Sequence, residues 1–158
     1  MEMRPFFQGR WHLSRTILNL KSKKIMMESI SGTCLFNETI TSEEEELLYT
    51  EELMMTQCET SSTMLIPASR QYLYSFPTNC DSFDMYFYKN EKPQAHFQRL
   101  KKQKEEEESM HHFSGLHDCF PDQYTTHLWI QSLTSFRIEI QVNGPEKHHL
   151  ITSKYTRG

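Results

Sequence analysis

Hydrophobic and polar residues alternate with a period of two along most of this chain. In the stretch FRIEIQV, residues 136–142, the first, third, fifth and seventh side chains are apolar and the three between them are polar. This alternation is typical of a half-buried strand with one face against a core and the other in water. The following Asn143-Gly144-Pro145 favours a turn, so residues 148–156 are predicted to return as the next strand.

The same pattern predicts ten short strands separated by polar segments. They span residues 10–18, 29–37, 46–55, 66–76, 82–89, 94–100, 112–119, 124–131, 135–143 and 148–156. We therefore expect an all-β fold, a single antiparallel barrel of about eight to ten short strands over residues 1–158, with a β-sandwich as the alternative. Residues 4–8 are predicted to form one short N-terminal helical turn that plugs one end.

The composition favours one folded domain and argues against several classes of partner. The chain has 158 residues, 12 % aromatic residues and a net charge of −4, without the basic excess of a nucleic-acid binder. No apolar stretch approaches the ~20 residues that cross a bilayer, and no secretory signal is visible. We expect a cytoplasmic protein without membrane insertion. In that compartment Cys34, Cys58, Cys80 and Cys119 should be free thiols.

Clusters of like charge are interpreted as solvated connections. The basic clusters lie in residues 21–24 and 101–104, and the acidic ones are Glu43–Glu46 and Glu105–Glu108. Adjacent like charges repel one another and do not share a strand core. The acidic runs also lack the glycine and the alternating ligands of a calcium loop.

Several polar side chains fall on faces that the alternation assigns to the interior. They are Tyr49, Glu51, Arg70, Tyr72, His117 and Cys119. Burying an unpaired charge is costly, so an inward arginine needs a carboxylate partner. Glu51 and Asp122 are the candidates for that partner. Asp122 also follows Pro121 at a predicted turn, where its carboxylate is expected to cap backbone N–H groups.

The segment GLHDCFPDQYTTHLWI, residues 115–130, allows three interpretations. A metal site would use the imidazole of His117 and the thiol of Cys119, but the segment supplies no obvious third ligand. A catalytic site would pair the Cys119 thiol with His117 as its base, in a cluster with Asp122 and Tyr124. The third interpretation, a binding pocket with a few polar groups in an aromatic cavity, is favoured.

The predicted ligand-binding residues are the inward polar side chains. They are Arg15, Tyr49, Glu51, Arg70, Tyr72, His117, Cys119 and Tyr124. Two arginines favour a carboxylate or phosphate group, so we expect a small acidic or amphipathic molecule inside the barrel. The alternatives are an enzyme using His117, Cys119, Asp122 and Tyr124, or a structural or protein-interaction barrel filled by its own side chains. The sequence assigns no catalytic residue, metal or cofactor.

Several short motifs match one known family in order along the chain. They are FQGRW (7–11), RTI (15–17), GTCLF (32–36), LYTE (48–51), RQY (70–72), HDC (117–119) with DQY (122–124), VNGPEK (142–147) and YTR (155–157). The chain resembles the small uncharacterised proteins of the domain of unknown function 6314 family. The resemblance spans nearly the whole chain and implies no activity. It departs in two predicted connections, by a longer acidic loop at 101–109 and extra residues near 21–27.

A second resemblance concerns the ends of the chain. Gly9-x-Trp11 on the first strand, with Arg157 after the last strand, is similar to the calycin pattern of lipocalins and fatty-acid-binding proteins. The pattern implies that Trp11 packs across a closed barrel end and that Arg157 caps it through a cation–π contact. A calycin-like barrel of this size has room for one small ligand.

Overall fold

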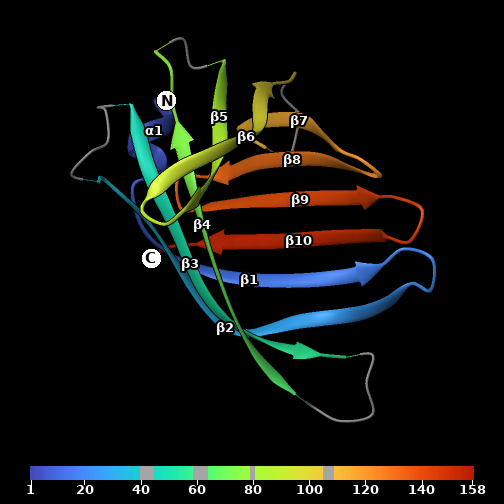
Figure 1. The fold of residues 1–158 in the computed structure, drawn as a ribbon. Coiled ribbons are helices and arrows are strands. Elements are labelled where there is room, and N and C mark those ends of the chain that lie inside the picture. Colours follow the sequence, from blue (N-terminus) through green and yellow to red (C-terminus); the bar gives the residue numbers. More distant parts are fainter. Residues whose placement is uncertain (40–44, 59–63, 79–80, 105–108) are drawn as a thin grey trace.

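The computed structural model describes residues 1–39, 45–58, 64–78, 81–104 and 109–158, which form an all-β barrel (Figure 1). One short helix precedes ten strands: α1 (Met3–Phe7), β1 (Gly9–Asn19), β2 (Lys24–Asn37), β3 (Glu46–Gln57), β4 (Leu65–Ser75), β5 (Ser82–Lys89), β6 (Lys92–Lys102), β7 (His111–Cys119), β8 (Asp122–Ser132), β9 (Ser135–Asn143) and β10 (His148–Thr156). All ten predicted strands and the helical turn are confirmed.

The strands form an antiparallel meander that closes on itself. Each strand pairs with the next one in sequence, and β1 pairs with β10 to close the barrel. The barrel prediction is therefore correct and the sandwich alternative is wrong. Closure removes the free sheet edges that an open sandwich would keep.

One irregularity in β2 shapes the interior. The β1–β2 ladder is interrupted between the pairs His12–Thr33 and Thr16–Glu28, and Gly32 lies in the interruption. A Cβ atom on Gly32 would lie 2.8 Å from the Leu53 Cβ and 2.9 Å from the Leu13 carbonyl oxygen. Only glycine accommodates so close an approach of β1 and β3 to the strand between them.

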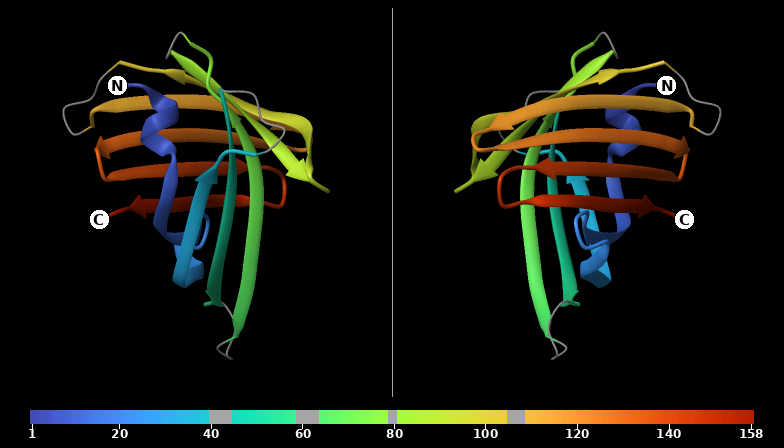
Figure 2. Two further views of the ribbon diagram at one scale, coloured as in Figure 1. Left: turned by 90° about the vertical axis from the view of Figure 1, so that its left-hand side faces the viewer. Right: turned by 90° about the vertical axis from the view of Figure 1, so that its right-hand side faces the viewer.

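Helix α1 and an arginine close one end of the barrel. The left view of Figure 2 shows the helix lying across this end, beside the C-terminus. The Trp11 ring is fully buried there and donates a hydrogen bond from Nε1 to the Phe7 carbonyl, 2.8 Å away. The guanidinium carbon of Arg157 lies 4.1 Å from the Trp11 ring centroid, in the arrangement that the calycin pattern implies.

The opposite end carries the β1–β2, β3–β4, β5–β6, β7–β8 and β9–β10 connections, because the strands alternate in direction. We call it the open end. The basic cluster at 21–24 lies here and is exposed, whereas Lys101 and Lys102 lie on β6 near the closed end.

Some predictions concern residues outside those described. They are the loop assignments of Glu43, Glu44 and Glu105–Glu108, and the free thiol of Cys80. Cys34, Cys58 and Cys119 are free cysteines. In the part of the chain that the structure describes, no helix has the length and hydropathy needed to span a membrane.

Candidate ligand-binding site

The interior of the barrel holds a cavity of about 740 Å³ in its open half. Aromatic and aliphatic side chains from six strands form most of its wall: Tyr72, Phe87, Phe97, Tyr124, Ile140, Val142 and Ile151. Polar side chains join them: Arg70, Lys89, Gln94, His117, Cys119, Lys147 and His149. Several of these polar residues are exposed, so the cavity is open to solvent. Its volume and mostly apolar wall are typical of small-molecule sites.

One wall of the cavity is the hairpin formed by β5 and β6. Its two-residue turn, Asn90-Glu91, has positive φ at both positions, as a tight hairpin turn requires. In the described residues β4 pairs with β5 only through Tyr72–Ser75, so the rest of β4 separates from the hairpin. The cavity reaches the surface through this separation, and Figure 1 shows the hairpin crossing in front of β4.

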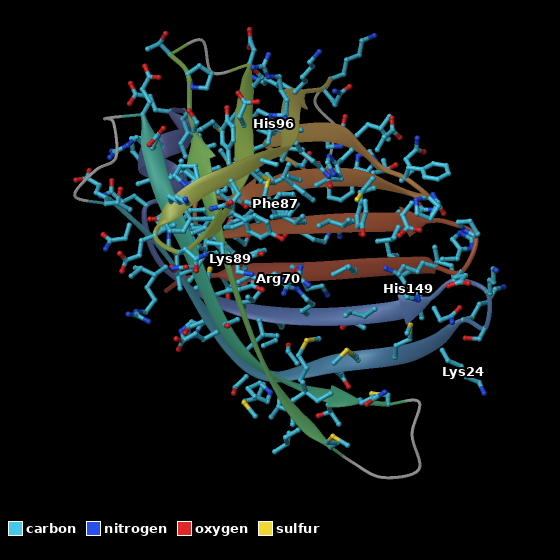
Figure 3. All side chains as sticks on the ribbon, viewed as in Figure 1. Lys24, Arg70, Phe87, Lys89, His96 and His149 are labelled. Carbon is cyan, nitrogen blue, oxygen red and sulfur yellow. The ribbon has the colours of Figure 1, made fainter. Side chains whose placement is uncertain are left out.

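Arg70 is the arginine that lines the cavity. It lies on β4 directly opposite Glu51 in the ladder, and its charge helps to lower the pKa of the Glu51 carboxyl. Within the described residues, however, its guanidinium makes no hydrogen bond or ion pair. Figure 3 shows Arg70 below Phe87, with Lys89 of β5 on one side and His149 of β10 on the other. Arg70 can therefore offer a free guanidinium to an anionic group.

The other inward arginine, Arg15, is already paired. Its Nη1 and Nη2 donate to the two carboxylate oxygens of Glu51 at 2.6 and 2.8 Å, and its Nε donates to Ser153 Oγ at 2.8 Å. Glu51 also accepts a short hydrogen bond from the Tyr49 hydroxyl, which lies 3.1 Å from the Tyr155 hydroxyl. Each of the three guanidinium nitrogens of Arg15 thus donates a hydrogen bond to a partner inside the barrel.

Burial and ion pairing act in opposite directions on this network. Burial alone would lower the pKa of Arg15 and raise that of Glu51, because it disfavours both charged forms. Their paired hydrogen bonds and opposite charges outweigh burial, so the pKa of Arg15 is raised and that of Glu51 is lowered. Burial raises the pKa of the nearby Cys34 thiol to about 12. Both members of the ion pair therefore remain charged at neutral pH, and Cys34 remains a thiol.

The eight predicted binding residues separate into two groups. Arg70, Tyr72, His117, Cys119 and Tyr124 line the cavity. Arg15, Tyr49 and Glu51 belong to the buried network and do not line it. The Tyr72 ring joins the two groups, since its centroid lies 6.1 Å from that of Tyr49 and 5.8 Å from that of Phe97.

The cluster predicted for catalysis lies at one corner of the cavity. The His117 ring packs against Phe97 and Tyr124, with centroid distances of 5.1 and 6.0 Å. Asp122 Oδ2 lies 3.6 Å from Lys147 Nζ, and the same carboxylate fills the space beside Gly144. Asp122 thus contacts the β9–β10 connection, and in the described structure it does not cap backbone N–H groups of its own turn as predicted.

No nucleophile–base pair is assembled at that corner. In the described ranges, no hydrogen bond joins any two of His117, Cys119, Asp122 and Tyr124. The same ranges contain no group of three or more His, Cys, Asp or Glu residues that could hold a metal ion. The corner therefore presents an imidazole, an exposed thiol and a phenol to the cavity as separate groups.

The binding residues predicted from the sequence do not include the apolar part of the cavity wall. Phe87, Phe97, Ile140, Val142 and Ile151 line the cavity but were not selected, because inward apolar residues are expected in any core. The period-two pattern placed Ile140 and Val142 inward. It did not show where packing stops and a cavity begins.

Comparisons with known proteins show the family of this chain and a similar fold in a solved structure. The profile of a family described as "Family of unknown function (DUF6314)" matches residues 7–157. An S-type phycobiliprotein lyase from Guillardia theta is similar in structure, with a TM-score of 0.65 and 10 % identity over 98 % of this chain and 90 % of that one. A redesigned β-barrel, mFAP1, bound to DFHBI has a TM-score of 0.49 and 10 % identity, covering 99 % and 100 % of the two chains. No curated protein matches the chain.

Proposed function

This chain belongs to the DUF6314 family, whose function is unknown, and we propose that it binds a small acidic or amphipathic molecule in the open half of its barrel. The observation that carries this proposal is the unpaired guanidinium of Arg70 on the wall of an aromatic cavity of about 740 Å³. Arginine is suited to bidentate recognition of carboxylate and phosphate groups. The apolar wall around it would receive the rest of the ligand.

The neighbouring charges support an anionic group on the ligand. Lys89 lines the same cavity, as do Lys147, whose Nζ lies 3.6 Å from Asp122 Oδ2, and the imidazoles of His117 and His149. The carboxylate nearest in the ladder, Glu51, is completely buried and already accepts hydrogen bonds from Arg15 and Tyr49. A ligand anion would therefore meet the cationic groups of Arg70 and Lys89 without facing an unpaired carboxylate of the buried network.

Two fluorescent probes with the same ring system test this proposal. One is the anion 8-anilinonaphthalene-1-sulfonate, and the other is neutral N-phenyl-1-naphthylamine, which lacks the sulfonate. We expect saturable binding of both. Arg70→Gln should weaken binding of the anion roughly tenfold, since a hydrogen bond to a charged group is lost. Binding of the neutral probe should not change.

A second arginine provides the matched control. Arg10 lies on the exposed outer face of β1, so Arg10→Gln changes the net charge equally without touching the cavity. It should leave binding of both probes unchanged. Equal effects of Arg10→Gln and Arg70→Gln would refute recognition by Arg70. The absence of saturable binding by either probe would refute the cavity as a binding site.

A further inference from the structure

The turns at the open end form a rim, and contacts link several of them along one side of the barrel. The Leu20 amide donates to the His148 carbonyl at 2.8 Å, which joins the β1–β2 turn to the start of β10. The ion pair between Lys147 and Asp122 joins the β9–β10 connection to the start of β8. The Cys58 amide donates to the Met26 carbonyl at 2.7 Å, which joins the end of β3 to β2.

This rim exposes large apolar side chains. Phe120, in the β7–β8 turn, is 98 % exposed, the highest value among the exposed large hydrophobic residues of the described chain. Ile25, Met64 and Leu65 are 43 %, 53 % and 54 % exposed beside the β1–β2 and β3–β4 connections. An exposed apolar group gains free energy when a partner removes it from water.

One turn of this rim is basic although the whole chain is acidic. Lys21, Lys23 and Lys24 are exposed, and no carboxylate occurs in residues 20–27. Elsewhere at the open end the lysines have acidic neighbours: Lys89 and Lys92 flank Glu91, and Lys147 follows Glu146 and forms the ion pair with Asp122. Asp118, which is exposed, and Asp122 flank the turn that carries Phe120, whereas the lysine triplet beside Ile25 is not offset within its own turn.

We propose that this rim docks on the surface of an anionic lipid bilayer, with the open end of the barrel facing the membrane. Apolar side chains on separate turn tips, with a lysine triplet beside one of them, suit shallow insertion between anionic headgroups. Such contact is peripheral and needs no membrane-spanning segment. It goes beyond the proposed function, because it concerns where the barrel meets its ligand and can fail while the cavity still binds.

Co-sedimentation with phosphatidylcholine vesicles, with and without phosphatidylserine, tests the docking. We expect binding to the vesicles that contain phosphatidylserine, weakened by added salt. Phe120→Ser should reduce the partition coefficient roughly tenfold, because the turn loses its inserted ring. Replacing Lys21, Lys23 and Lys24 together with glutamine should reduce it roughly tenfold or more.

The closed end supplies matched controls. Leu133 is 63 % exposed in the β8–β9 turn, and Lys101 and Lys102 are exposed near the same end. Leu133→Ser and the double change Lys101→Gln with Lys102→Gln should leave vesicle binding unchanged. All variants should bind 8-anilinonaphthalene-1-sulfonate in solution like the unaltered protein, because none of these residues lines the cavity.

Three results would overturn the docking proposal. The first is that the protein binds neither the vesicles with phosphatidylserine nor those without it. The second is that the open-end and closed-end variants lose vesicle binding to the same extent. The third is self-association that Phe120→Ser abolishes while vesicle binding is unaffected, which would make the rim an interface between two copies of the chain. If the unaltered protein bound neither fluorescent probe, the proposed function would be refuted instead.

Discussion

The two halves of the barrel interior use similar residue types for different purposes. In the closed half, Phe7, Trp11, Phe36 and Phe136 are at most 1 % exposed and pack ring against ring. In the open half, Tyr72, Phe87 and Tyr124 line a cavity, and Phe87 is 37 % exposed. Close packing in one half can therefore supply the stability that leaves the other half open for a ligand.

The inward arginines show the same contrast. Arg15 is 7 % exposed and donates to Glu51 and Ser153, as a buried charge requires. Arg70 is exposed and lacks a protein partner in the described residues, so water or a ligand must solvate it. A satisfied charge stabilises the scaffold, whereas an unsatisfied one at a cavity wall is available for recognition.

The largest expected effect is the loss of a ring from the closed half. Phe136 stacks on Tyr155 at a centroid distance of 4.2 Å and contacts Trp11 at 4.8 Å. Phe136→Ala should lower the free energy of unfolding by about 3–5 kcal/mol, because it leaves a void in close packing. Phe87→Ala, in the cavity wall, should cost about 1 kcal/mol or less, because its ring is already partly in water. Urea unfolding of both variants measures the difference.

Similar losses for the two substitutions would contradict the division into a packed and an open half. A native-like circular dichroism spectrum in each variant is the control for correct folding. A loss larger for Phe87→Ala than for Phe136→Ala would place the stabilising core at the cavity instead.

The architecture could be predicted from the sequence because inward and outward side chains alternate along each strand. This alternation marks the strands directly in the hydrophobic pattern. The prediction for β2 was poorest, since it began at residue 29 whereas the strand begins at Lys24. A register shift between Ser29 and Ser31 interrupts the period-two pattern of β2. The residues before and after the shift therefore do not share a single alternation. The pattern was thus interrupted at a bulge, where side chains change face.

The second largest effect is expected in the buried ion pair below the cavity. Glu51→Gln removes the carboxylate that accepts two hydrogen bonds from Arg15, and leaves that guanidinium buried without its counter-charge. The expected cost is about 3 kcal/mol at neutral pH, measured by urea unfolding. Glu52→Gln, on the exposed outer face of the same strand, is the matched control and should cost almost nothing.

The pH dependence of the same variants identifies the cause. The pKa of Glu51 is lowered in the folded protein from an ordinary value of 4.5, since the ion pair outweighs burial. Its contribution to stability is therefore complete above that ordinary value and is lost as the pH falls through the folded pKa. The stability difference between unaltered protein and Glu51→Gln should narrow on acidification. A difference that stays constant with pH would show that altered packing causes the loss.

The sequence could not show which arginine pairs with Glu51. Arg70 is the direct neighbour of Glu51 in the β3–β4 ladder, and cross-strand neighbours are the first partners to expect. The structure instead joins Glu51 to Arg15, from a strand that is separated from β3 by β2. The close approach at Gly32 brings β1 and β3 together. This contact is a property of the folded barrel, and the hydrophobic pattern of the sequence does not reveal it.

The smallest effect compares arginines at the two ends of the barrel. Arg157 lies over the Trp11 ring and donates to the carbonyl oxygens of Gln8 and Leu133 at 3.1 and 3.3 Å. Arg157→Gln should therefore lower the free energy of unfolding by about 0.5–1 kcal/mol. Arg70→Gln should lower the free energy of unfolding by less, because the Arg70 guanidinium makes no hydrogen bond to the residues that the structure describes. Equal urea midpoints for Arg157→Gln and unaltered protein would show that the cap is not stabilising. A larger loss from Arg70→Gln would show that its charge supports the barrel through Glu51, so that stability and ligand recognition share one residue.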